Sequence, residues 1–275
     1  MKKIAVIGLG LIGTSLLKAL QNKGYELYGI SRNPDTIKKA LEQNLVSKAS
    51  SDLELIRSAD VIFIATPIET IIKTIDSIKP NINRDTIVAD LAGVKGFVLD
   101  YIHNLDTRLN FIGLHPMAGT ENKGFDSAVE GLFEDSKWAV VPSNFAKRES
   151  IDFIVNLIRQ IGATPVFTDA KSHDRAVAMI SHLPLILAQS LFMSASDKLE
   201  KNLAASGFRD MTRLAMTNSD IAHDMVKFNK ANILECLTEL DFTAKNLLKN
   251  YQNTDIEKIA VQRRKMYSEE GKNLY

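Results

Sequence analysis

This chain of 275 residues carries an imidazole at a position suited to proton transfer. The imidazole belongs to His115, at the start of the segment 115–120 (HPMAGT), and directly follows the apolar run 110–114, which predicts a buried strand. Parallel sheets bind their ligands at the carboxyl ends of their strands. A neutral imidazole accepts protons near neutral pH, because its unperturbed pKa is about 6.5. We therefore predict that His115 is a general base.

A pair of arginines could hold an anionic substrate. Arg209 and Arg213 lie four residues apart in the segment 207–213 (GFRDMTR), so on a helix both would project from one side. Asp210 can neutralise Arg209, which leaves Arg213 free to bind a carboxylate as a bidentate pair. The predicted substrate-binding residues are His115, Gly119, Thr120 and Arg213.

The remaining four histidines are less clearly placed. His182 lies in a long stretch without charged residues, and it is either a satisfied core histidine or a polar group facing a cleft. We include it with His115 and Arg213 among the catalytic candidates. His103 and His223 are expected on helix surfaces, and His173 could cap a helix.

Three glycines near the N-terminus predict a dinucleotide site. The segment 8–13 (GLGLIG) follows the apolar run 4–7, which predicts a strand. It precedes a stretch up to residue 20 whose apolar residues have the spacing of a helix. Gly8 permits a tight turn, Gly10 lets a pyrophosphate approach the backbone, and Gly13 lets the helix pack on the strand. The free N–H groups at the helix start, including those of Leu11 and Ile12, would face the phosphates. Glycine triplets also serve ordinary turns, so the strand-to-helix context carries this prediction.

The end of the second strand, 26–30, bears on the choice of cofactor. NAD-preferring enzymes place an acidic side chain there, whereas this chain has Ser31 and Arg32. A hydroxyl and a guanidinium suit a 2′-phosphate, so we predict NADP, with NAD less favoured. The alternative is that Arg32 is an exposed loop residue. Further cofactor contacts are predicted after the next strands, at Thr66, Pro67 and Gly93.

The elements that position these residues alternate along the first half of the chain. Strands are predicted at 4–7, 26–30, 60–65, 86–89, 110–114, 138–141 and 164–167, with helices at 14–20, 34–44, from 68 and at 149–162. This alternation is typical of a doubly wound, Rossmann-type parallel sheet. From about residue 169 only helices are predicted, at 174–199, 210–216, 220–250 and 255–267. We therefore expect a dinucleotide-binding domain at 1–168 and an all-helical domain at 169–275.

Composition excludes several classes of protein. A net charge of +1 gives no electrostatic basis for binding nucleic acid or an anionic membrane. The single cysteine, Cys236, cannot form an intramolecular disulfide and is typical of a reducing compartment. The first strand begins at residue 4, so we expect no signal peptide and a cytoplasmic protein. No cluster of His, Cys and carboxylates has the spacing of a metal site.

The stretch 176–196 contains no charged residue and is long enough to span a bilayer. It contains several polar residues and no second such stretch exists, so we favour a helix buried at the centre of a helical domain or between subunits. This predicts a homodimer formed through the helical half.

The motifs together resemble a known family. The segments 8–13 (GLGLIG), 115–120 (HPMAGT), 181–184 (SHLP) and 207–213 (GFRDMTR) occur in the order seen in prephenate and arogenate dehydrogenases of tyrosine biosynthesis. The resemblance implies oxidative decarboxylation, in which hydride passes to the nicotinamide, carbon dioxide leaves and the ring becomes aromatic. It also implies that His115 accepts the hydroxyl proton, that Arg213 binds the substrate carboxylate and that His182 lies close to the cleft.

Two departures from the family pattern concern substrate and cofactor. Leu185 follows SHLP, where many prephenate-specific members carry a second histidine, and Gly93 stands where the family often has serine. With Ser31 and Arg32, Leu185 makes the chain more similar to the NADP-linked arogenate dehydrogenases of photosynthetic organisms. In such a source the expected location would be a plastid-like stroma rather than the cytoplasm.

Two other classes of function fit part of the sequence. β-Hydroxyacid dehydrogenases and pyrroline-carboxylate-type reductases share a sheet with a helical half, but the former usually need a lysine on the long helix, and 176–196 has none. A non-enzymatic NADP sensor would need neither a base nor a substrate arginine, so the presence of both His115 and Arg213 argues against it.

Overall fold

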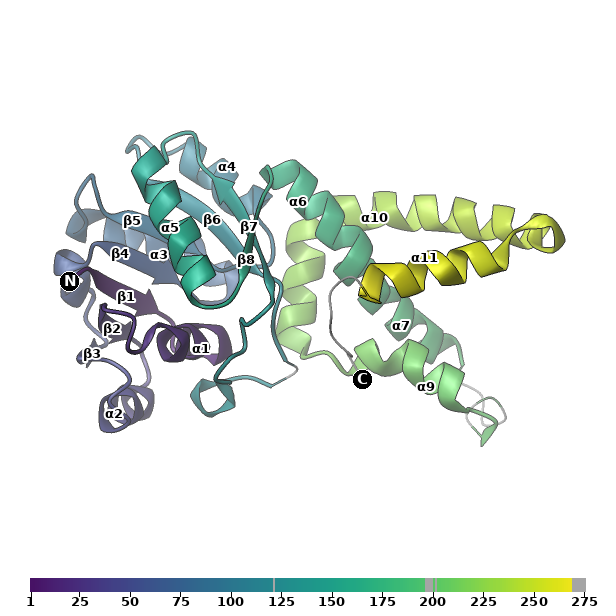
Figure 1. Ribbon diagram of the computed structural model, residues 1–275, viewed down its shortest axis with the longest axis horizontal. Coiled ribbons are helices and arrows are strands. Elements are labelled where there is room, and N and C mark those ends of the chain that lie inside the picture. The colour runs from purple at the N-terminus through teal and green to yellow at the C-terminus, as the bar shows by residue number, and fades with distance from the viewer. Residues whose placement is uncertain (121, 196–199, 201, 269–275) are drawn as a thin grey trace. The chain divides into compact units, whose positions relative to one another are not determined.

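The computed structural model describes the chain except for residues 121, 196–199, 201 and 269–275. It contains two compact units, Met1–Ile233 and Leu234–Tyr275 (Figure 1). The first unit holds the sheet and every candidate site residue.

An eight-stranded sheet forms the core of the first unit, in the order β3-β2-β1-β4-β5-β6-β7-β8. The chain leaves β1 toward one edge and later returns beside it with β4, so the strand order reverses between these two strands. This confirms the predicted Rossmann-type architecture. The strands are β1 (Lys3–Ile7), β2 (Glu26–Ile30), β3 (Lys48–Ser50), β4 (Val61–Ile64), β5 (Ile87–Asp90), β6 (Phe111–Pro116), β7 (Lys137–Pro142) and β8 (Thr164–Phe167).

The sheet is parallel from β3 to β6, but β7 pairs with β6 in the antiparallel direction and β8 runs parallel to β7. The prediction of a wholly parallel sheet is therefore wrong at this edge. The apolar residues of β7 are buried whichever way the strand runs, so their pattern does not encode direction. The three-residue β3 is an additional strand that was not predicted.

Helices cover both faces of the sheet because successive residues of the inner strands point to opposite sides. Ile4 and Val6 face a core that includes α1 (Leu11–Leu20), α2 (Pro34–Glu42) and α5 (Arg148–Gln160). Ala5 and Ile7 face a second core. The elements in that core are the 3-10 helix η1 (Leu53–Ser58), α3 (Ile68–Ile78) and α4 (Gly96–His103). Two further 3-10 turns are η2 (Lys79–Asn81) and η3 (Phe125–Ser127).

The charge-free stretch is not one regular helix. It begins at the end of α6 (Ala170–Val177) and continues through a π-helical turn η4 (Ala178–His182) and α7 (Leu183–Ser194). Pro184 has no N–H to donate to the carbonyl of Ile180, four residues earlier, which fits a widened turn just before it. The helix predicted from residue 174 therefore begins earlier, and the last four residues of its predicted range lie outside the described residues.

The other predicted helices of this half are present. They are α9 (Ser206–Thr212) with the 3-10 turn η5 (Arg213–Met216), α10 (Ser219–Lys249), the 3-10 turn η6 (Tyr251–Asn253) and α11 (Ile256–Ser268). Asn229 interrupts α10 with a non-helical conformation, φ −131° and ψ 19°.

One helical run among the described residues, Ala170–Ser194, meets the length and hydropathy expected of a membrane span, with a mean hydropathy of 1.7. A single run of this kind is weak evidence, since core helices of globular domains have the same composition. About a third of its most apolar window is buried within the chain.

The predicted domain boundary at residue 169 stays a proposal. The compact units divide between Ile233 and Leu234, so α6 belongs to the same unit as the sheet. The Asp174 carboxylate in α6 accepts the backbone N–H groups of Lys95 and Gly96, which follow β5.

Candidate active site

The glycine loop after β1 has the close contacts that its sequence predicted. Gly8 has a φ of +97°, and a Cβ atom there would lie 2.7 Å from the carbonyl oxygen of Ala65. A Cβ atom at Gly13 would lie 2.0 Å from the carbonyl oxygen of Gly8, so helix and loop touch at backbone distance. Around Gly10, by contrast, a Cβ would find no heavy atom within 4 Å. This leaves open space beside the backbone at Gly10.

The start of α1 provides free donors for an anion. Gly10 is the N-cap residue and offers no side-chain oxygen to the helix. The N–H groups of Leu11, Ile12 and Gly13, in the first helical turn, have no carbonyl four residues earlier within the helix. Together with the open space at Gly10, these donors fit the pyrophosphate of a dinucleotide.

A groove of about 550 Å³ runs along the carboxyl ends of β1, β2 and β4. It lies where the strand order reverses, which is the usual ligand crevice of such sheets. The hydroxyl of Thr66, which lines the groove, is buried without a hydrogen-bond partner among the described residues. The predicted cofactor residues that line the groove are Gly8, Gly10, Ser31, Arg32, Thr66 and Pro67.

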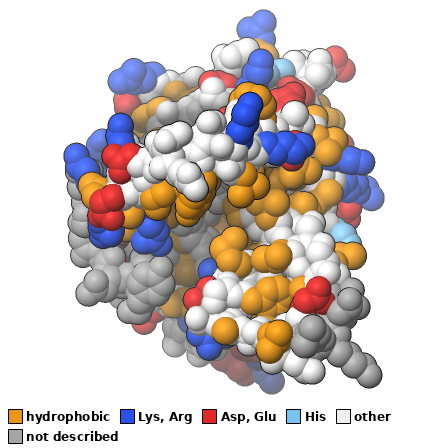
Figure 2. Space-filling model, turned by 90° about the vertical axis from the view of Figure 1, so that its right-hand side faces the viewer, with side chains coloured by type: hydrophobic (Ala, Val, Ile, Leu, Met, Phe, Trp, Pro, Cys, Tyr) orange, Lys and Arg blue, Asp and Glu red, His pale blue; other side chains and the backbone are white. Residues whose placement is uncertain are grey.

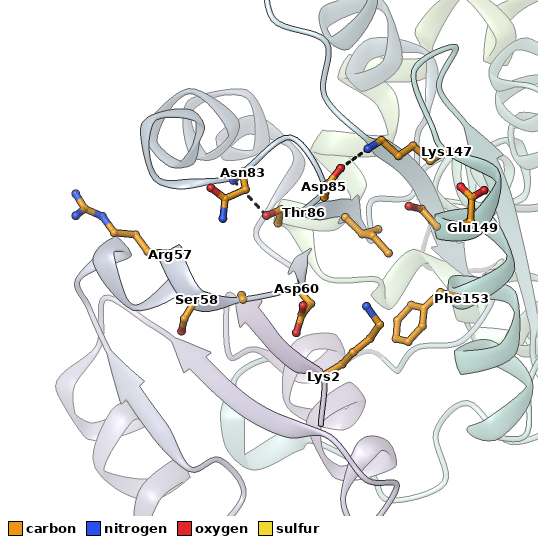
Figure 3. Close-up of a pocket in the computed structure, with 13 residues that line it drawn as sticks. Lys2, Arg57, Ser58, Asp60, Asn83, Asp85, Thr86, Lys147, Glu149 and Phe153 are labelled. Atoms are coloured by element: carbon orange, nitrogen blue, oxygen red, sulfur yellow. Dashed lines mark hydrogen bonds and ion pairs between the residues drawn. The ribbon is translucent and has the colours of Figure 1, made fainter.

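A larger hollow of about 830 Å³ lies at the opposite, amino ends of β1, β4 and β5 (Figure 3). Among the side chains that line it, Lys147 forms an ion pair with Asp85, and Lys2 lies over the ring of Phe153. Ligands of doubly wound sheets bind at the other end of the strands. We therefore assign the functional site to the carboxyl edge.

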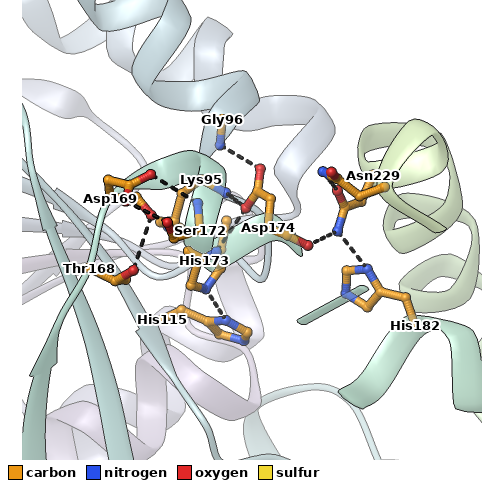
Figure 4. Close-up of polar contacts among 12 residues, drawn as sticks. Lys95, Gly96, His115, Thr168, Asp169, Ser172, His173, Asp174, His182 and Asn229 are labelled. Atoms are coloured by element: carbon orange, nitrogen blue, oxygen red, sulfur yellow. Dashed lines mark hydrogen bonds and ion pairs between the residues drawn. The ribbon is translucent and has the colours of Figure 1, made fainter. Parts of the chain in front are cut away.

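His115 is the second-to-last residue of strand β6, and it is partly buried. Its Nδ1 lies 3.0 Å from Nε2 of His173, at the start of α6 (Figure 4). A Cβ atom at Gly93, in the loop after β5, would lie 3.6 Å from Nε2 of His115. The predicted base and the predicted cofactor loop are therefore neighbours.

His173 is not a cap, because Asp169 caps α6 by accepting the N–H of Ser172. It is instead buried, with its Nδ1 2.8 Å from the Asp174 carboxylate and its Nε2 toward His115 (Figure 4). His173 is not among the site residues that the sequence predicts. The adjacent His-Asp pair at a helix start was the only available indication, and caps commonly have that appearance.

The surroundings of His115 favour its neutral form. Desolvation by burial lowers the pKa of His115 well below 6.5, and the charges of His173, Lys95 and His182 lower it further. The imidazole is therefore unprotonated near neutral pH and can accept a proton.

A buried ion pair lies beneath the site. Lys95 is fully buried and donates to the Asp90 carboxylate and to the carbonyl oxygen of Leu114 at 2.7 Å. Burial raises the pKa of Asp90 and lowers the pKa of Lys95. Because Leu114 directly precedes His115, this lysine fixes the end of β6 as well as the loop after β5.

His182 belongs to the π-helical turn and is buried. The Nδ2 of Asn229 donates to the carbonyl oxygen of Asp174 at 2.7 Å, which identifies this atom as the NH₂ group of the amide. The same NH₂ group lies 3.1 Å from Nδ1 of His182. Nδ1 must then accept, and the proton of neutral His182 lies on Nε2. Desolvation by burial lowers the pKa of His182 to about 4. Nδ1 of His182 therefore has a hydrogen-bond partner within the protein. The catalytic role of His182 stays a prediction.

Arg213 is the first residue of η5 and is exposed. Arg209 and Asp210 lie 3.6 Å apart, as the sequence suggested, and no described residue forms a hydrogen bond or ion pair with the Arg213 guanidinium. Gly119 and Thr120 follow β6, and Thr120 accepts the N–H of Asn122. No described contact joins Arg213 to His115. Within the described part of the chain, no cluster of three metal-ligating side chains occurs.

Two family models match the chain. The nucleotide-binding domain of prephenate dehydrogenase matches residues 16–167, and the dimerization domain of the same family matches residues 169–263.

Individual relatives agree with these matches. The prephenate dehydrogenase of Bacillus subtilis is 31% identical over 246 residues, which cover 86% of this chain and 66% of that protein's length. The crystal structure of Synechocystis arogenate dehydrogenase is 32% identical, covers 97% of this chain and 98% of its own, and gives a TM-score of 0.83. Prephenate dehydrogenase from A. aeolicus, in complex with hydroxyphenyl propionate and NAD+, is 22% identical over 97% of this chain and 98% of its own, with a TM-score of 0.87, and so shares the fold.

The chain thus spans somewhat less than two thirds of the length of the B. subtilis relative and nearly all of the Synechocystis structure. The two family models together account for most of its residues, including both sides of the site around His115. On this basis the chain belongs to the prephenate dehydrogenase family.

Proposed function

We propose that this protein oxidatively decarboxylates arogenate or prephenate with NADP, giving tyrosine or 4-hydroxyphenylpyruvate. The observation that carries the proposal is the neutral imidazole of His115 beside the Gly93 loop, at the same sheet edge as the nucleotide groove. A base at this position can reach a substrate that lies against the nicotinamide.

The reaction needs a proton acceptor, an anion-binding group and a hydride acceptor. The bound nicotinamide supplies the hydride acceptor. Nε2 of His115 takes the proton of the ring hydroxyl, and the electron pair of that O–H bond forms the carbonyl as hydride leaves the same carbon. Loss of carbon dioxide from the opposite ring carbon then sends the electron pair of the broken bond through the ring to the carbonyl oxygen, which takes the proton back from His115 and leaves an aromatic phenol. Arg213 binds the side-chain carboxylate of the substrate as a bidentate pair.

We favour arogenate over prephenate. The two substrates differ in one group, an amine in arogenate and a keto group in prephenate. Leu185 is buried and apolar at the position after SHLP, so it offers no donor to a keto oxygen. The 32% identity with the Synechocystis arogenate dehydrogenase, over nearly the full length of both chains, supports the same choice.

We favour NADP over NAD. Ser31 and Arg32 both line the nucleotide groove directly after β2, where an acidic residue would otherwise bind the ribose hydroxyls. A guanidinium can bind a 2′-phosphate as a bidentate partner. Lys73 of α3 lines the same groove and adds a second positive charge.

We also infer a homodimer formed through the helical half. The π-helical turn and α7 leave large apolar side chains exposed, including Ile180 at 69% and Met193 at 75%. Apolar side chains are also frequent on the face in Figure 2. Such surfaces are normally covered by a partner, and the second family model is named a dimerization domain. Light scattering at micromolar protein should give twice the mass of one chain, and a monomer would contradict the inference.

Steady-state assays test the reaction. Absorbance of the reduced cofactor should rise with arogenate and, more slowly, with prephenate. His115→Asn should lower kcat about 100-fold or more while the KM for NADP stays within a factor of two to three. Arg213→Ala should raise the KM for arogenate and leave the KM for NADP unchanged. His223→Asn, which alters an exposed histidine of α10, is the matched control. Turnover of a β-hydroxyacid in place of both cyclic substrates would overturn the proposal.

A further inference from the structure

His115 can act as a base only if its free lone pair is on the nitrogen that meets the substrate. We propose that His173 and Asp174 are positioning residues that keep the proton of His115 on Nδ1, so that Nε2 presents its lone pair beside Gly93. The proposal rests on the proposed role of His115 as general base and adds the two residues that make this role possible.

The Asp174 carboxylate is buried and accepts hydrogen bonds on both oxygens. Its Oδ1 accepts the backbone N–H of Lys95 at 2.7 Å, and its Oδ2 accepts the backbone N–H of Gly96 at 2.8 Å. Backbone N–H groups can only donate, so both oxygens act as acceptors and the carboxylate is locked in place. Oδ1 also lies 2.8 Å from Nδ1 of His173 (Figure 4). Nδ1 of His173 must therefore carry a proton.

A neutral imidazole has one N–H and one lone pair. With its proton on Nδ1, His173 presents the lone pair of Nε2, which lies 3.0 Å from Nδ1 of His115. Two lone pairs at that distance would repel, so Nδ1 of His115 carries the proton and donates it. The lone pair of His115 is then on Nε2, the atom that lies against Gly93.

The arrangement also serves the reaction. When Nε2 of His115 takes the substrate proton, the O–H bond breaks and a new N–H bond forms on the same ring. The Nδ1–H bond to His173 is unchanged by this step, so the ring keeps its orientation throughout. The hydrogen bond made by one ring nitrogen commonly decides the state of the other.

One alternative reverses the assignment. If His173 were an imidazolium, its Nε2–H would donate to Nδ1 of His115 and push the proton of His115 onto Nε2. Nε2 would then have no lone pair for the substrate. The two cases differ in which nitrogen of His115 carries hydrogen, so nitrogen NMR separates them without any assay of turnover.

The first experiment uses the full-length protein with ¹⁵N-labelled histidine, saturated with NADP at pH 8. His115→Asn and His173→Gln assign the two sets of ring resonances. We expect Nε2 of His115 to resonate as a nitrogen without hydrogen and Nδ1 as a nitrogen with hydrogen. The reverse pattern at His115 would overturn the proposal. Exchange between the two patterns in the wild type would do the same.

The second experiment separates positioning from structural support. His173→Phe should lower kcat roughly 100-fold, because the tautomer of His115 is no longer fixed, with the KM for NADP nearly unchanged. His173→Gln keeps an acceptor oxygen for Nδ1–H of His115, so its kcat should be at least about tenfold higher than that of His173→Phe. If His173→Phe fails to fold, the comparison of His173→Gln with His173→Leu, both checked by thermal melting, replaces it. Equal kcat in the Gln and apolar variants would contradict the proposal.

The pH profile gives a readout that a purely structural role would not move. The titratable and charged groups near His115 are His173, Lys95 and His182, and each lowers its pKa. His173 has this effect only in its protonated form, which glutamine cannot adopt. In His173→Gln the acid limb of kcat/KM should therefore move to higher pH, whereas the exposed control His223→Gln should leave it in place. If His115→Asn keeps its turnover, the proposed function fails. If only His115→Asn is impaired and the His173 variants behave as wild type, the present proposal fails alone.

Discussion

Gly93 leaves a space against the Nε2 edge of His115: a Cβ atom at position 93 would touch Nε2 at 3.6 Å and Cε1 at 3.7 Å. These are ordinary van der Waals distances, and the φ of Gly93 lies outside the left-handed region, so a side chain fits without backbone strain. The relationship places the loop after β5 and the end of β6 around one nitrogen atom.

Gly93→Ser should place a hydroxyl within reach of Nε2 of His115 while the protein keeps its stability. A hydrogen bond donated to Nε2 stabilises the neutral ring and lowers the pKa of His115 further. With a bond worth about 1 kcal/mol, the acid limb of kcat/KM should move down by somewhat less than one pH unit. Gly93→Ala, which adds the carbon without the hydroxyl, is the control. An identical limb in the Ser and Ala variants would show that the hydroxyl does not reach the imidazole.

The two glycines of the first helix turn should respond differently to alanine. Gly13→Ala places a carbon 2.0 Å from the Gly8 carbonyl oxygen, so urea unfolding should show a loss of about 2 kcal/mol or more. Gly10→Ala meets no protein atom within 4 Å and should change stability by less than about 0.5 kcal/mol. Its KM for NADP should nevertheless rise at least tenfold, because the added methyl occupies the space that we assign to the pyrophosphate. Unchanged cofactor binding in Gly10→Ala would move the pyrophosphate elsewhere.

Arg32 provides a test of cofactor choice. A charge-assisted bond to the 2′-phosphate is worth about 1.5–3 kcal/mol, so Arg32→Ala should raise the KM for NADP roughly 10- to 100-fold. The KM for NAD, which lacks that phosphate, should change by less than about twofold. Lys39→Ala, whose ion pair with Asp126 is exposed and outside the groove, is the control. Equal efficiency with both cofactors in the wild type would refute the NADP assignment.

His182 should make the stability of the fold depend on pH. Its pKa falls from about 6.5 in the unfolded chain to about 4 in the folded one, so between these values the unfolded state binds more protons. Stability is therefore fully present above pH 6.5 and is lost as the pH falls toward 4, by up to about 3 kcal/mol. His182→Gln should flatten this part of the curve, measured by urea unfolding from pH 8 to pH 4.5. The control His223→Gln should follow the wild-type slope, and parallel curves for His182→Gln and wild type would contradict the assignment.

Much of the fold follows from local patterns. The strands β2 and β8 begin and end at the residues that their apolar runs indicated, and the glycine loop lies between β1 and α1 as predicted. His115 stands near the carboxyl end of its strand because the apolar run before it stops there. These features depend on residues close together in the chain, whose spacing records which side is buried.

Other features depend on partners that lie far apart in the chain. The direction of β7 is set by pairing with β6, which local hydrophobicity does not record. From its local sequence His173 is expected to cap a helix, yet its partner His115 is 58 residues away in the chain. Asp174 likewise binds the backbone of Lys95, which is 79 residues away. Contacts of this kind form only when separate elements pack together.

By itself, the sequence determined the doubly wound sheet, the nucleotide loop and the imidazole at the end of β6, because each of these follows from the types and spacing of residues that are neighbours in the chain. Only the tertiary structure decided which groups surround that imidazole. A histidine on α6 and a glycine after β5 come to its two nitrogens because the helix docks on the sheet through the Asp174 carboxylate. The chemistry of His115 therefore depends on burial and on hydrogen-bond partners, which no local pattern of residues specifies.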